Sequence, residues 1–217
     1  TGNKDSLWVN VYGVSERYLN VYGEKDLRAQ MNQFFHRTYT HPVDGTTLDM
    51  KMLCNWYWSD ETAILETGKG TKDWNFYRYA ETLLSAAEAI AQSSGVNAEA
   101  AGYLAQVKAR ANMEGKDVST IASELQRLGK QAFIEECWKE RLREFPLEMK
   151  IWDDCVRTGK FPQISATNKG EVQFVDLIGA TNGSGAKFKE TDLYWPIPVN
   201  EIQRNPNLTQ NEGYSAK

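Results

Sequence analysis

The sequence predicts a mainly α fold, built from helical hairpins with long ordered loops and an irregular C-terminal strap. Between residues 74 and 157, apolar side chains recur at three- and four-residue steps, which is the spacing of one helix face. The first two of these helical stretches are joined by only a few residues, so they should pack antiparallel. The segment 193–214 contains three prolines, which exclude a regular helix or a central strand there.

The first part of the chain, residues 1–73, reads as irregular. Leu7–Tyr12 alternates partly and is rich in β-branched side chains, so we expect one short strand there. Arg28–Phe35 fits a short helix, and the following Thr38–Asp49 is rich in turn residues.

From Asn75 the pattern becomes helical, and we expect a first helix that ends at Gly95. Its apolar face is rich in alanine, which allows another helix to approach closely. A second helix begins near Asn97. These two helices define the first predicted hairpin.

A third helix is expected near Ser119, with Ser119 or Thr120 as its N-cap. Gly129 interrupts the pattern, and Pro146 should end or kink the stretch that follows. Residues Leu147–Arg157 read as helical again. The hairpins have the size of tetratricopeptide units, but the sequence shows no clean self-similar repeat.

The strap at the end of the chain is expected to be ordered although it is irregular. Asparagine and glycine supply turn chemistry, while Trp195, Ile197 and Leu208 serve as apolar anchors. We interpret it as a segment that closes the helical domain, preceded by loops from residue 158 onwards.

Composition fits one domain of ordinary soluble character, which we place at residues 1–217 with a loop-rich part (1–73), a helical core (74–157) and loops with the strap (158–217). The chain is 41% hydrophobic and carries a net charge of −4, so it lacks the basic footprint of a nucleic-acid-binding protein. It contains no run of 18 apolar residues and no signal-peptide pattern.

No motif indicates a cofactor, a metal site or a catalytic residue. Gly68–Lys72 lacks the spacing of a phosphate loop, and no nucleophile elbow occurs. His36 and His41 have no partner ligands nearby. The cysteines share no metal spacing, and we expect buried free thiols at Cys54, Cys137 and Cys155.

Carboxylates and guanidiniums alternate on the helical stretch before Pro146. Glu136, Glu140 and Glu144 lie at i, i+4 spacing, with Arg141 and Arg143 between them and Glu148 beyond. A pair of catalytic carboxylates normally comes from different elements that line a cleft. We therefore interpret this block as a structural ion-pair network. Glu81 and Glu88 should likewise pair with Arg110 or Arg141 inside the hairpin stack.

Three blocks, in this order, resemble one protein family. The first is Tyr77–Ala89 followed by Tyr103–Ala111, the second runs from Glu140 to Arg157, and the third is the tail from Leu193 to Tyr214. Together they are similar to the SusD/RagB family of outer-membrane nutrient-binding lipoproteins of Bacteroidetes. The chain departs from the family pattern at Lys108, Met149 and Ile151, and at Pro146, which interrupts a helix.

The resemblance implies a protein that captures glycans or other nutrients and is not an enzyme. It implies a place at the outer face of the outer membrane, over a SusC-like TonB-dependent transporter. Membrane attachment would use only an N-terminal lipid anchor, which is absent from this chain, so the chain looks like a C-terminal portion of a member.

Sugars stack their C–H faces on aromatic rings and bind polar side chains through their hydroxyls. One loop offers both, and we expect ligand contacts from Asn55, Trp56, Tyr57, Trp58 and Trp74. Trp138, Trp152 and Trp195 are instead expected to pack in the protein. A helical protein-interaction scaffold that binds no sugar remains the alternative.

Overall fold

The structure, a computed structural model, describes residues 13–215, so the strand expected at Leu7–Tyr12 lies outside the described residues. The chain divides into two units. The first contains the residues up to Ile151 together with Ile164–Gln173, and the second contains Trp152–Gln163 and the residues from Phe174 onwards. The predicted single-domain organisation stays a prediction.

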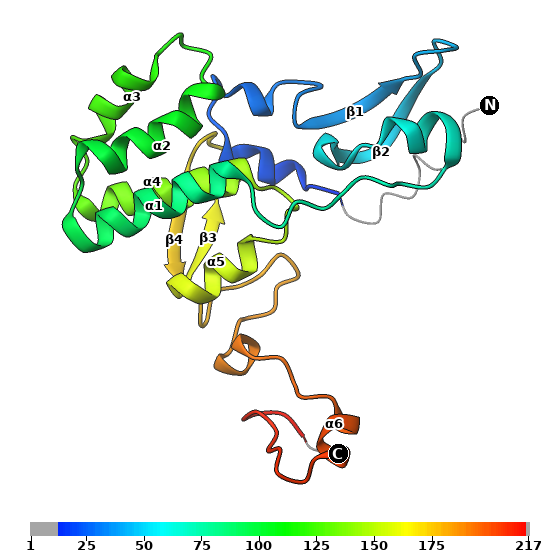
Figure 1. Cartoon of the computed structure of the whole chain (residues 1–217), viewed down its shortest axis with the longest axis vertical. Helices are drawn as coiled ribbons and strands as arrows, with labels where there is room; N and C mark the ends of the chain where they lie inside the picture. The colour runs from blue at the N-terminus through cyan, green and yellow to red at the C-terminus, as the bar shows by residue number, and fades with distance from the viewer. Residues whose placement is uncertain (1–12, 216–217) are drawn as a thin grey trace. The chain divides into compact units, whose positions relative to one another are not determined.

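The predicted helical hairpin is confirmed in the first unit. Helix α1 (Tyr79–Ser94) ends at Gly95, whose φ of +82° is a conformation that favours glycine. Helix α2 (Ala98–Arg110) begins after Asn97, whose side-chain oxygen accepts a 2.9 Å hydrogen bond from the Ala100 amide. Figure 1 shows the two helices beside each other, and they are in contact.

Alanine fills the contact between these helices, as the sequence indicates. Ala87 and Ala91 on α1 are fully buried, as are Ala101 and Ala105 on α2. Helices α3 (Val118–Leu125) and α4 (Lys130–Glu144) complete the group, because α3 packs on α2 and α4 on α1. Their shared core includes large buried side chains: Leu84, Leu104, Ile121, Phe133 and Phe145.

Replacing Ala87 with leucine is expected to lower the free energy of unfolding by about 1–3 kcal/mol, because the added methylenes have no space at a closely packed helix contact. Urea denaturation followed by circular dichroism measures the loss. Ala89→Leu is the matched control, since Ala89 is exposed on the same helix. Equal stability of both variants would contradict close packing at Ala87.

Two helix boundaries differ from their predictions. The N-cap of α3 is Asp117, whose carboxylate accepts from the Thr120 amide at 2.8 Å, so the expected cap at Ser119 or Thr120 is wrong by two or three residues. Helix α4 ends before Pro146, as predicted. The next helix, α5 (Ile151–Thr158), starts later than Leu147 because Leu147 and Met149 adopt positive φ angles of 59° and 60°.

The expected helix at Arg28–Phe35 is wrong. Only Leu27–Ala29 makes a 3-10 turn, and strand β1 (Phe35–Thr40) begins where the helix was expected to end. It pairs antiparallel with β2 (Thr47–Asn55), with Phe35 opposite Asn55 and a bulge between His36 and Thr38. Aromatic and β-branched side chains favour this strand pairing over a helix.

In the second unit, Trp152 packs as expected. Its ring lies 5.5 Å from that of Phe188, which in turn lies 5.2 Å from Phe161 on strand β3 (Lys160–Ile164). Strand β4 (Val172–Asp176) pairs with β3. The last residue of β3 and the first two residues of β4 are assigned to the first unit.

The tail differs from its prediction in two respects. It contains a six-residue helix, α6 (Val199–Arg204), which starts directly after Pro198, where a fixed φ is compatible with a helix start. Trp195 is 82% exposed and Leu208 is 36% exposed, so they are not the buried anchors that we expected. Polar contacts hold the tail instead, because the Gln210 amide bonds both the N–H and the carbonyl of Ile197 at 2.8 Å.

All three cysteines are free and buried, as predicted. None of the helices within residues 13–215 is long and apolar enough to cross a membrane. Over the same residues, no three His, Cys, Asp or Glu side chains gather as ligands for a metal ion.

Candidate functional site

The predicted aromatic loop forms a 3-10 turn, Trp56–Trp58, directly after β2. Asn55 fixes this turn rather than facing solvent. Its buried side chain accepts from the Tyr57 amide at 3.0 Å and donates to the carbonyl of Pro146. The Trp56 amide donates to the Phe34 carbonyl at 2.8 Å, so the turn is tied both to the start of β1 and to the end of α4.

Trp56 packs on side chains of β1. Its ring stacks on His36 with centroids 4.0 Å apart and planes 12° apart, and it lies 5.6 Å from the ring of Tyr39. These contacts hold the indole in one orientation. The three rings form an aromatic wall. Strand β1 contributes His36 and Tyr39, and the turn after β2 contributes Trp56.

This wall borders a cavity of about 380 Å³, which we call the Trp56 cavity. Both aromatic rings and small polar side chains line it. Its lining residues are Asn32, His36, Thr38, Tyr39, Thr40, Trp56, Ser59, Glu61 and Ile64. Such a mixture of aromatic faces and convergent polar groups is typical of a site for a polar ring-shaped ligand.

The environment keeps the titratable rings of the wall uncharged at neutral pH. Burial lowers the pKa of His36 against the opposing effect of hydrogen bonds with Gln33, Asn32 and Thr38. Burial and the negative charge of Glu61 raise the pKa of Tyr39. The Tyr39 hydroxyl oxygen is itself buried and finds no hydrogen-bond partner among the described residues, an arrangement that costs about 1–3 kcal/mol.

Trp58 and Trp74 form a second, more open group. Their rings lie 5.6 Å apart and nearly perpendicular, and Trp74 stacks on Phe76 at 6.0 Å. Trp74 is 49% exposed and Phe76 is 74% exposed. These three residues, named here the aromatic ridge, present ring surface to solvent.

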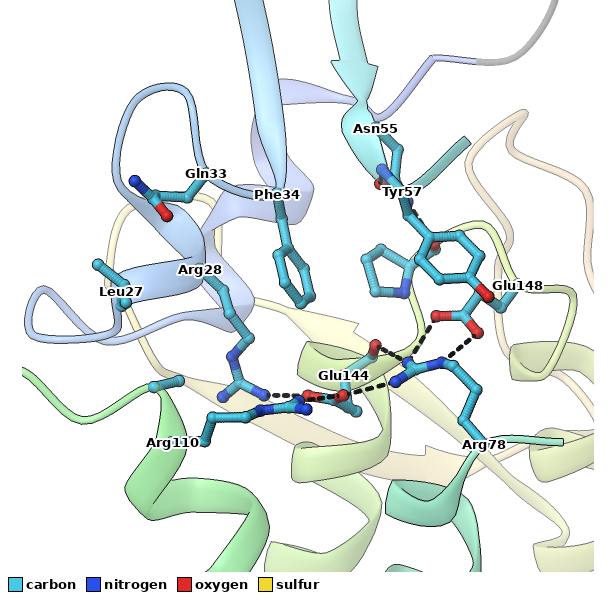
Figure 2. A pocket seen from close by; sticks show the side chains of 12 residues that line it. Leu27, Arg28, Gln33, Phe34, Asn55, Tyr57, Arg78, Arg110, Glu144 and Glu148 are labelled. Atoms are coloured by element: carbon cyan, nitrogen blue, oxygen red, sulfur yellow. Dashed lines mark hydrogen bonds and ion pairs between the residues drawn. The ribbon is translucent and has the colours of Figure 1, made fainter. Parts of the chain in front are cut away.

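Tyr57 points to a different cavity, of about 350 Å³. Figure 2 shows its ring above Arg78, with the guanidinium carbon 5.5 Å from the ring centre. The amide of Asn75 donates to the Tyr57 hydroxyl at 3.1 Å. The five predicted ligand residues are therefore spread over three places. Trp56 lines the Trp56 cavity, Trp58 and Trp74 lie on the aromatic ridge, and Tyr57 and the buried Asn55 line the Tyr57 cavity.

The floor of the Tyr57 cavity is the charged block. In Figure 2, Arg28, Arg78 and Arg110 all reach Glu144, and Arg78 also pairs with Glu148 at 2.7 Å. Glu144 is fully buried and its ion pairs with Arg28 and Arg78 measure 3.0 and 2.9 Å. The interpretation of this block as a structural ion-pair network is confirmed.

The network continues along α4. Glu140 pairs with Arg28 at 2.9 Å and with Arg143 at 3.1 Å, and Glu136 pairs with Arg143 and Lys108. Burial alone would raise the pKa of Glu140, but the positive charges of Arg28, Lys108 and Arg143 lower it well below its ordinary value.

The remaining predicted partners of this block lie on α1. Glu81 pairs with Arg141 at 3.3 Å, as expected. Glu88 accepts a hydrogen bond from the ring N–H of Trp138 at 2.8 Å, which fixes that tryptophan against the core.

His36, Tyr39 and the threonines of the Trp56 cavity are not among the ligand residues predicted from the sequence. They lie on β1, which was interpreted as the end of a helix followed by turns. The run His36–Thr40 is rich in aromatic and β-branched residues, a signal for a strand.

Comparison with known proteins gives consistent results. A sequence model of the SusD family matches residues 15–214. The starch-binding protein SusD of Bacteroides thetaiotaomicron is 33% identical over 177 residues, which cover 81% of this chain and 28% of that protein. The crystal structure of a SusD superfamily protein from Parabacteroides distasonis is similar, with a TM-score of 0.78 and 28% identity, over 98% of this chain and 47% of that one. The chain thus spans less than half the length of these relatives.

Proposed function

The chain belongs to the SusD family, and from this premise we propose that it captures an oligosaccharide or a related nutrient without turning it over. The single observation that carries the proposal is the Trp56 cavity with its aromatic wall and its ring of polar side chains. One of the similar proteins, SusD, is named a starch-binding protein, and this name supports a carbohydrate as the ligand class.

The chemistry of the cavity suits a sugar. The ring of Trp56 offers an apolar face for the C–H groups of a pyranose, and its stack on His36 keeps that face oriented. Hydroxyls of Thr38, Thr40 and Ser59 line the same space and both donate and accept hydrogen bonds. The unpartnered Tyr39 hydroxyl gains a partner if it reorients toward a bound ligand.

The aromatic ridge extends this site in our proposal. Trp58 follows Trp56 in the same turn, and Trp74 with Phe76 continues the exposed ring surface. A chain of several sugar units can contact the ridge while one unit occupies the Trp56 cavity. Tyr57 contributes less to ligand binding in our proposal. The cations of Arg78 and Lys72 already lie over its ring, and the amide of Asn75 donates to its hydroxyl.

Family membership supports the cellular setting that we propose. The protein would act at the outer face of the outer membrane, held by a lipid anchor of the full-length form, and would deliver its ligand to a SusC-like TonB-dependent transporter. Copurification of such a transporter with the tagged full-length protein tests this part separately from ligand binding.

Alanine at Trp56, Trp58 or Trp74 is expected to weaken glycan binding by about tenfold or more, the scale of a buried aromatic contact. Isothermal titration of the full-length protein against a panel of oligosaccharides measures the effect. Trp195→Ala is the control, since Trp195 is exposed but lies in the tail. Undiminished affinity in all three variants would overturn the proposed site, and transporter binding without any glycan affinity would favour the scaffold alternative.

A further inference from the structure

Among the described residues that line the Trp56 cavity, Glu61 is the one acidic side chain. It is exposed, and no Lys, Arg or His of the described part of the chain forms an ion pair with it. Glu61 differs in this from Glu140 and Glu144, which are each neutralised by several cations. Within the part of the chain that the structure describes, no cation pairs with its charge at the cavity.

The other lining groups do not offset this charge. His36 is the only basic residue of the lining within residues 13–215, and its lowered pKa keeps it neutral at pH 7. Tyr39 feels the negative charge of Glu61, which contributes to its raised pKa and places the carboxylate within electrostatic reach of the aromatic wall.

Two cations near the cavity in sequence, Arg37 and Lys72, are engaged elsewhere. Arg37, between two lining residues on β1, pairs with Glu16. Lys72 donates to the carbonyls of Tyr57 and Ser59, and its ammonium lies 5.2 Å from the centre of the Tyr57 ring. The lining therefore carries a net negative charge beside two electron-rich rings.

We propose that Glu61 is a specificity-determining residue that makes the Trp56 cavity select neutral and amine-bearing sugars against acidic ones. This inference rests on the proposed function, because it names the charge class of the ligand bound at that site. A ligand carboxylate brought to about 5 Å from Glu61 meets a repulsion worth roughly a fourfold loss of affinity in a water-like medium, and more where water is excluded. An ammonium group gains attraction from the carboxylate and from the faces of Trp56 and Tyr39.

The test uses ligands with the same sugar ring, in which one substituent is neutral, cationic or anionic. Each set consists of a hexose, its 2-amino form and its uronate, for the gluco, galacto and manno series, titrated into the full-length protein with tryptophan fluorescence as the readout. Glu61→Gln keeps the shape and removes the charge. Glu66→Gln is the matched control, since Glu66 is exposed in the next turn and does not line the cavity.

In the wild-type protein, the uronate of a binding set should bind at least about fourfold more weakly than the neutral hexose, and the amine at least as tightly. Glu61→Gln should reduce the differences in affinity among the three ligands, whereas Glu66→Gln should leave these differences unchanged. Raising the salt concentration should narrow the difference in the wild-type protein.

The experiment distinguishes a wrong role for Glu61 from a wrong proposed function. If neutral hexoses bind but the uronate binds equally well, or if Glu61→Gln leaves the ratio unchanged, the role of Glu61 is wrong while the proposed function stands. If no member of any set and no oligosaccharide binds, both the proposed function and this inference are overturned.

Discussion

Replacing Glu144 with alanine is expected to lower the free energy of unfolding by about 3–5 kcal/mol, the cost of removing one partner from a buried ion pair. Glu144 is fully buried and is shared by Arg28, Arg78 and Arg110, so its loss removes a counterion from the buried Arg28 and from the largely buried Arg78. These arginines come from the 3-10 turn before β1, the start of α1 and the end of α2 (Figure 2). The carboxylate thereby joins three segments at one point.

Urea denaturation followed by circular dichroism measures this loss. Glu144→Gln keeps the volume and removes only the charge, and it should also destabilise the protein strongly. The control is Glu135→Gln on the same helix, because Glu135 is partly exposed and accepts only from Gln131 among its described contacts. A change below about 1 kcal/mol for Glu144→Ala, the range of surface ion pairs, would show that the network does not support the fold.

The helices could be predicted because their signals are local. The apolar period of α1 and α2 follows from the one face that each helix buries, and Asn97 and Gly95 are end signals that act within one turn. The cap at Asp117 was missed because Ser119 and Thr120, two and three residues later, are equally good capping types.

The β1–β2 hairpin could not be predicted in the same way. Its loop contains His41–Pro42 and Asp44–Gly45, and these turn signals obscured the strands on both sides. Strand pairing also depends on contacts between residues as distant as Phe35 and Asn55. The aromatic turn was predicted from its composition, but its partners His36 and Tyr39 become visible only when β1 is in place.

The ion-pair network shows the same limit. The spacing of the glutamates on α4 indicated a structural role, but it did not indicate Arg28, which lies 116 residues before Glu144. Nor could the sequence distinguish the directions of Trp56 and Tyr57, neighbours in one turn that face different cavities.

Acidification should remove much of the stability that this network supplies. The positive charges of Lys108 and Arg143 lower the pKa of Glu136, and those of Arg28, Lys108 and Arg143 lower that of Glu140, in each case against the effect of burial. In the unfolded chain both groups titrate near 4.3. Between that value and the lower folded pKa the unfolded state binds more protons, so the free energy of unfolding rises with pH in this range. The contribution is complete above about pH 5 and is lost progressively as the pH falls towards 2.

Urea denaturation at a series of pH values between 7 and 2 measures this loss, which we expect to be on the order of 2–3 kcal/mol for one strongly paired carboxylate. Glu136→Gln should destabilise the protein at pH 7 and show a shallower decrease on acidification, so that the two curves converge at low pH. The carboxylate of Glu136 is a suitable target because it is less buried than that of Glu140 and pairs with Arg143 at 2.9 Å. Glu124→Gln, at an exposed pair with Lys116, should leave the slope nearly unchanged. Parallel pH curves for wild type and Glu136→Gln would mean that the charge on Glu136 contributes nothing to folding, because a group that titrates alike in both states leaves the pH dependence unaltered.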